Sequence, residues 1–67
     1  MDPKDIFELI IKADEKLKYS TGAKADIRRQ QATELLNEAL AAAREAGNDG
    51  LIAQAEQRLA DLGAAPA

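Results

Sequence analysis

Apolar residues recur every three or four positions in three stretches of the chain, a spacing that puts side chains on one face of an α-helix. The pattern predicts helices over about residues 3–19, 24–46 and 50–62. No useful length of sequence alternates apolar and polar residues with a period of two, so we expect no β-strand. The residues expected on the buried faces are Ile6, Leu9, Ile10, Ala13 and Leu17, then Ala32, Leu35, Leu36, Ala39, Leu40, Ala43 and Ala46, and finally Leu51, Ile52, Ala55, Leu59 and Leu62.

The start and end of the first helix carry typical boundary residues. Asp2 can cap free backbone N–H groups, and Pro3 suits the first position of a helix. After the last apolar position, Ser20, Thr21 and Gly22 predict a turn with hydroxyl groups available for capping. The chain is expected to resume a helix shortly after this turn.

The second turn and the end of the third helix are marked in the same way. Gly47 suits the left-handed conformation that ends many helices, and Asn48 or Asp49 can cap the helix that follows. Gly63 is expected to end the third helix. Residues 64–67 are expected to form a flexible tail.

Short turns between successive helices predict antiparallel neighbours, and therefore an all-α, three-helix bundle over residues 1–63. Alanine makes up 15 of the 67 residues and about half of the 46% hydrophobic content, which favours closely spaced helices. The second helix is the expected centre of the bundle. Its small contact residues are Ala32, Ala39, Ala43 and Ala46.

The order Ala32, Leu36, Ala39 in the second helix is similar to the second helix of a tetratricopeptide repeat. The stretch "ATELLNEALAAAREAGNDGLIAQAEQRLADLG", residues 32–63, extends the resemblance, with Leu59-Ala60 in the next helix. The resemblance implies about one and a half repeats, without the proline that usually follows the second helix. In length and helix order the chain also resembles the three-helix microtubule-interacting-and-transport domains. The generic stretch "QATELLNEAL" is the only sequence motif that supports this second resemblance. Both resemblances imply a helical protein-interaction module.

The composition argues against an enzyme. The chain has no Cys and no His, so thiolate nucleophiles, the usual zinc sites and the common proton shuttle at neutral pH are missing. We therefore expect no catalytic residue, no metal and no cofactor. Acidic residues precede the first apolar run, unlike a secretory signal, and no apolar stretch approaches the roughly 20 residues of a membrane span. A cytoplasmic protein with no membrane contact is the expectation.

Three large apolar residues are candidates for contact with a partner. Phe7 and Ile11 widen the apolar arc of the first helix beyond the face that a bundle needs. Phe7 either closes the end of the bundle over the third helix or belongs, with Ile11, to a partner-binding face. Ile27 lies nearly opposite Leu36 if the second helix is continuous through it. It either folds back as a staple at the start of that helix, which we favour, or is exposed.

Basic residues gather around the first turn. Residues 12–29 hold six basic and three acidic residues, whereas the rest of the chain holds three basic and nine acidic residues, for a net charge of -3. The simplest interpretation is that these charges are solvated and complement the end of the first helix. A binding role would make them a basic pole, with Lys16, Lys18, Lys24, Arg28 and Arg29 as its candidate residues.

The sequence thus predicts a small, non-catalytic protein-protein interaction module that packs a helix against itself, as in a homodimer, or against a partner protein. The alternative is a module that binds nucleic acid or an acidic peptide through the basic pole. Nucleic acid is the less favoured ligand, because the protein is acidic overall and Tyr19 is the only aromatic residue near the pole.

Overall fold

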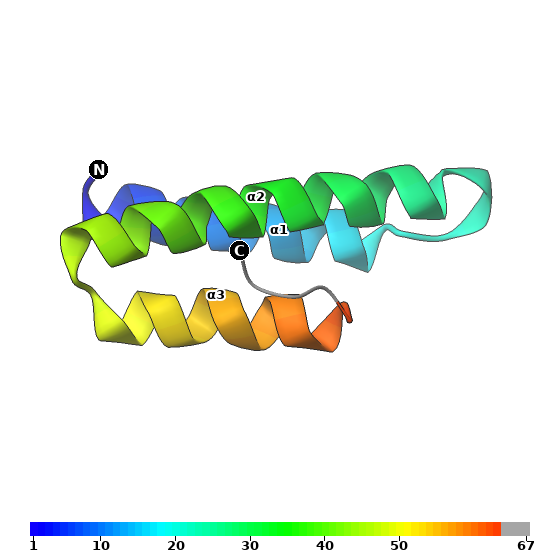
Figure 1. Ribbon diagram of the computed structural model, residues 1–67. Helices are drawn as coiled ribbons and strands as arrows, with labels where there is room; N and C mark the ends of the chain where they lie inside the picture. The colour runs from blue at the N-terminus through cyan, green and yellow to red at the C-terminus, as the bar shows by residue number, and fades with distance from the viewer. Residues whose placement is uncertain (64–67) are drawn as a thin grey trace.

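The computed structural model describes residues 1–63, which form three α-helices (Figure 1). These are α1 (Pro3–Lys18), α2 (Ala25–Ala46) and α3 (Asp49–Asp61), with a short 3-10 helix, η1 (Gly22–Lys24), directly before α2. The all-α, three-helix fold predicted from the sequence is confirmed, and each helix end lies within one residue of its expected position. The tail expected over residues 64–67 lies outside the described residues.

The helices run up, down and up, so α1 and α3 are parallel to each other and antiparallel to α2 (Figure 1). Both α1 and α3 pack mainly against α2, and they touch each other much less. Helix α2 is therefore the centre of the bundle, as the sequence predicts. The sparse contact between α1 and α3 leaves parts of their facing edges open to solvent.

The core follows the helical spacing of the sequence. Helix α1 buries Ile6, Ile10 and Ala13 completely, and α3 buries Ala55 and Leu59. The second helix contributes the largest share, which is Ala32, Leu36, Ala39, Leu40 and Ala43. Half-buried apolar residues pack around this core at its rim, and they are Leu9, Leu17, Leu35, Ala42, Ile52 and Leu62.

One alanine of the expected contact surface lies elsewhere. Ala46 is exposed, although its spacing from Ala39 and Ala43 puts it near the same face of α2. It is the last residue of α2, and the chain turns away at Gly47, which has a positive φ of 68°. Ala43 is the buried residue of this last turn, so the helical pattern alone overestimates the contact surface.

The helix ends differ in how they are capped. The Asn48 side chain accepts a hydrogen bond from the N–H of Leu51 at 3.1 Å, so Asn48 caps α3. The expected side-chain cap at Asp2 is not formed, and instead the Asp2 carbonyl accepts the N–H of Ile6 at 3.0 Å. At the other end of α1, the Ser20 hydroxyl donates to the carbonyl of Leu17 at 2.7 Å.

Candidate interaction surfaces

Two large apolar residues are exposed on one edge of α1. Phe7 is 43% exposed and Ile11 is 37% exposed, whereas Ile6 and Ile10, one position before each, are fully buried. Successive residues of a helix are turned by about 100°, so a pair next to the buried face must lie at its border. Phe7 is therefore only partly covered, and Phe7 with Ile11 forms an apolar strip that we name the α1 edge.

An ion pair fixes the side of α1 on which this edge lies. Arg58 of α3 donates from Nε to both carboxylate oxygens of Asp14, at 2.9 Å to Oδ1 and 3.1 Å to Oδ2. Asp14 follows Phe7 by seven residues, or about two helical turns, and so lies on the same side of α1. The α1 edge therefore runs along the border of α1 that faces α3.

The same ion pair sets the level of the α1 edge along the bundle. Because α1 and α3 are parallel and Arg58 is level with Asp14, residues seven positions earlier in each helix are also level. These residues are Phe7 and Leu51. Leu51 is 8% exposed, the largest exposed fraction among the buried apolar residues. The Leu51 side chain, level with Phe7, is thus not completely covered.

The structure separates Ile27 from the α1 edge. Ile27 is 56% exposed, so the favoured staple at the start of the second helix is wrong. The 3-10 turn η1 runs directly into α2 at Ala25, so Ile27 is already helical and points to the side opposite Leu36. Because α1 and α2 are antiparallel, Ile27 lies near the end of α1, and Phe7 lies near its start.

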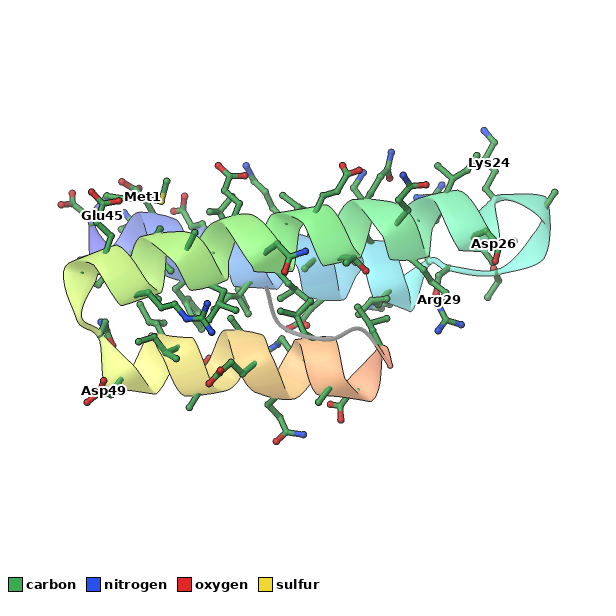
Figure 2. All side chains as sticks on the ribbon, viewed as in Figure 1. Met1, Lys24, Asp26, Arg29, Glu45 and Asp49 are labelled. Carbon is green, nitrogen blue, oxygen red and sulfur yellow. The ribbon has the colours of Figure 1, made fainter. Side chains whose placement is uncertain are left out.

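The basic pole is divided between two sides of the bundle. Lys16, Lys24 and Arg28 line one surface hollow together with Ile27 and Gln31, with a volume of about 280 Å³. Arg29 is turned by about 100° from Arg28 and does not line this hollow. Figure 2 shows Lys24 and Arg29 projecting from opposite sides of the start of α2.

Lys18, the remaining residue of the predicted pole, also lies away from this hollow. Its Nζ is 5.7 Å from the centre of the Tyr19 ring, within the range of a weak cation-π contact. The predicted pole is therefore three cations around one hollow, with Lys18 and Arg29 elsewhere.

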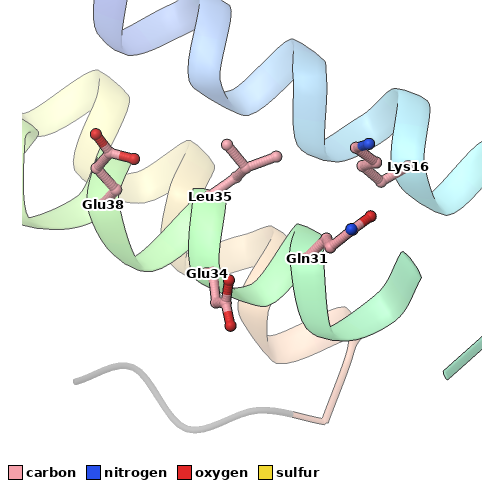
Figure 3. Close-up of a pocket in the computed structure, with 5 residues that line it drawn as sticks. All are labelled: Lys16, Gln31, Glu34, Leu35 and Glu38. Atoms are coloured by element: carbon pink, nitrogen blue, oxygen red, sulfur yellow. The ribbon is translucent and has the colours of Figure 1, made fainter. Parts of the chain in front are cut away.

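A second hollow of about 320 Å³ adjoins the first, because Lys16 and Gln31 line both. Figure 3 shows Lys16 on α1 facing Gln31 and Leu35 on α2. Glu34 and Glu38 complete the lining, with Glu34 turned away from α1 in this view.

Of the residues of this second hollow, the sequence predicts a binding role for Lys16 alone. The available signal is the spacing of Arg28, Gln31, Leu35 and Glu38, which repeats at three or four residues along one side of α2. The position of Lys16 across from them depends on how α1 packs, which this spacing does not encode.

Over residues 1–63, no group of three or more Asp or Glu side chains is placed so that it could hold a metal ion. In the same part of the chain, every helix is too short or too polar to cross a membrane. Comparison with protein-family models, curated proteins and solved structures gives no match to this chain. The resemblances to tetratricopeptide repeats and to microtubule-interacting-and-transport domains therefore stay predictions.

Proposed function

We propose that the chain is a small, non-catalytic protein-protein interaction module that acts by helix-helix packing through the α1 edge. The observation that carries this proposal is the exposure of Phe7 and Ile11, one helical turn apart, beside a core that other residues fill. Apolar side chains at this spacing are the usual anchors when one helix packs against another protein. The absence of Cys and His from the sequence supports a non-catalytic role, and we propose a cytoplasmic location with it.

A second copy of the chain is the occupant that the charges favour. When two α1 helices cross antiparallel about a two-fold axis level with Leu9, facing residues have numbers that sum to about 18. Phe7 of each copy then meets Ile11 of the other, so each apolar patch covers its equivalent. Lys4 of each copy comes beside Asp14 and Glu15 of the other, which gives attraction at both ends of the patch.

The expected association is weak. Two side chains from each copy bury far less area than the roughly 1,200–2,000 Å² of a stable, specific interface. Rim contacts from the ends of α1 add to this area but are largely polar. We therefore expect dimers to form in the micromolar to millimolar range rather than at nanomolar concentrations.

Sedimentation velocity over this concentration range tests the proposal. The parent chain is expected to shift from monomer to dimer, and Ile11→Glu is expected to stay monomeric because a charge at the centre of the patch would be buried without a partner. Ile27→Glu is the matched control, since it makes the same change at an exposed isoleucine away from the α1 edge. It should dimerise like the parent.

Circular dichroism separates loss of association from loss of the fold. All three chains are expected to have the same helical content, because each substituted residue is at least 37% exposed. A parent that is monomeric throughout the range would contradict the homodimer. Unfolding of the Ile11→Glu variant would place Ile11 in the core and contradict the α1 edge as a free surface.

A further inference from the structure

The two adjoining hollows form one continuous surface between α1 and α2, which we name the α1/α2 groove. It lies on the side of α1 opposite the α1 edge, since Lys16 follows Phe7 by nine residues, a rotation of about 900° or two and a half turns. A ligand in the groove therefore leaves the α1 edge free. The lining residues are Lys16, Lys24, Ile27, Arg28, Gln31, Glu34, Leu35 and Glu38.

Charge is ordered along this groove. Lys24 and Arg28 border its end near the first turn, and Lys16 lies where the two hollows meet. Two carboxylates, Glu34 and Glu38, border its other end. Arg28 and Glu38 are ten residues apart on α2, which is about 15 Å at 1.5 Å per residue. The groove is therefore positive at one end and negative at the other over the length of a short helix.

Apolar side chains lie between these charges. Ile27 borders the positive hollow and is 56% exposed, and Leu35 of the second hollow is half-buried. The two are eight residues apart on α2, which is about 12 Å. A helix that lies along α2 offers a matching pair of apolar side chains at positions i and i+7, about 10.5 Å apart.

We propose that the α1/α2 groove binds an amphipathic helical segment of a partner protein that is acidic at its N-terminal end and basic at its C-terminal end. Acidic side chains are favoured in the first turn of a helix and basic ones in the last. The bound segment therefore runs parallel to α2, with its acidic first turn at Lys16, Lys24 and Arg28. Its basic last turn meets Glu34 and Glu38, and its apolar residues cover Ile27 and Leu35.

The same charge order disfavours nucleic acid as the ligand. A polyanion gains from Lys16, Lys24 and Arg28 but must approach Glu34 and Glu38 at the other end of the groove, on a chain whose net charge is -3. A partner that itself changes sign along its length meets no such repulsion. The proposed segment thus uses the whole groove, whereas a nucleic acid uses only part of it.

Two synthetic peptides test this proposal. The forward peptide has about 15 residues, the length at which an alanine-rich helix becomes marginally stable, with Glu in its first turn, two Leu seven positions apart and Lys in its last turn. The reversed peptide has the same composition with Lys first and Glu last. Fluorescence anisotropy of labelled peptide, titrated with the full chain, is expected to show at least tenfold tighter binding of the forward peptide. Equal binding of the two peptides, or no binding of either, would overturn the proposal.

Two neighbouring arginines provide a matched pair of variants. Arg28→Glu is expected to weaken binding of the forward peptide at least tenfold, because Arg28 lines the groove. Arg29→Glu changes the net charge equally but lies outside the groove, so its effect should be less than twofold. The double variant Arg28→Glu/Glu38→Lys, which removes most of the charge difference between the two ends of the groove, should lose most of the preference for the forward peptide. Equal effects of the two single variants would mean that overall charge, and not the groove, governs binding.

A labelled single-stranded oligonucleotide is the competing probe. If it binds the parent chain more tightly than the forward peptide does at physiological salt, the groove is a nucleic-acid site and the peptide proposal is wrong. The Ile11→Glu chain should bind the forward peptide as the parent does. This result distinguishes the groove from the homodimer, because either proposal can fail while the other holds.

Discussion

The Arg58 guanidinium on α3 holds the carboxylate of Asp14 on α1, which lies 44 positions earlier in the chain. The two helices touch little elsewhere, since each packs mainly against α2. Arg58 also donates from Nη1 to the carbonyl of Gln54 at 3.3 Å, which directs its side chain along α3. The pair therefore shows the register between α1 and α3, and with it the position of the α1 edge.

The coupling between Asp14 and Arg58 should be measurable but small. Their side chains are 40% and 27% exposed, so solvent screens the attraction, and we expect about 0.5–1 kcal/mol. A double-mutant cycle of Asp14→Asn and Arg58→Gln, measured by urea unfolding, gives this value. The pair Arg44 and Glu56, at 3.5 Å and with both side chains more than 40% exposed, should give a smaller coupling. A coupling that does not fall with added salt would contradict an electrostatic origin.

Helix packing predicts different outcomes for the same substitution at two alanines of α2. Ala39 is fully buried where the helices meet, so Ala39→Leu should overpack the core and lower the free energy of unfolding by about 1–3 kcal/mol. Ala46→Leu makes the same change at an exposed position and should change stability by less than about 0.5 kcal/mol. Thermal unfolding followed by circular dichroism distinguishes them. If Ala39→Leu unfolds at the temperature of the parent, Ala39 is not at a close helix contact.

The two glycines around the second turn should respond to alanine with opposite signs. Gly47 has a φ of 68°, which disfavours a side chain, so Gly47→Ala should lower the free energy of unfolding by about 1 kcal/mol. Gly50 lies within α3, and a Cβ there meets only Asn48 Oδ1 at 3.6 Å, an ordinary contact. Gly50→Ala should therefore raise the free energy of unfolding by about 0.5–1 kcal/mol. Urea unfolding of both variants gives the two signs directly.

The helices and the core could be predicted because they depend on spacing along the chain. Ile6, Ile10 and Ala13 follow the period of a helix, and all three are buried. Whether the side chains of Ala46 and Ile27 are buried depends on whether a neighbouring helix covers them, and no local pattern in the sequence encodes this. Ile27 is exposed because η1 leads straight into α2, although an isoleucine at that place in the sequence also fits a staple.

The candidate surfaces show the same limit more strongly. The apolar excess at Phe7 and Ile11 is visible in the sequence, because the arc is wider than one buried face requires. The pairing of Asp14 with Arg58 and the position of Lys16 beside α2 are long-range contacts that depend on the packing of three helices. Neither the α1/α2 groove nor the division of the basic pole could therefore be derived from helical spacing alone.

The charges beside the α1 edge provide the most specific test of the homodimer. In the antiparallel pairing, Lys4 of one copy lies beside Glu15 of the other, so Lys4→Glu alone should weaken self-association several-fold through repulsion. Glu15→Lys alone should weaken it as well. An equal mixture of the two variants should associate more tightly than either variant alone. In each mixed pair, Glu at position 4 meets Lys at position 15 at one end of the patch, and Glu15 meets Lys4 at the other, so both ends attract.

Sedimentation equilibrium of the two single variants and of their mixture, at low and high salt, measures this effect. The preference for the mixture should shrink as salt rises, because these side chains lie at an exposed rim. Lys12→Glu, which changes charge on the opposite side of α1, is the control and should associate like the parent. If the mixture associates no better than the single variants, the two copies do not meet antiparallel through the α1 edge.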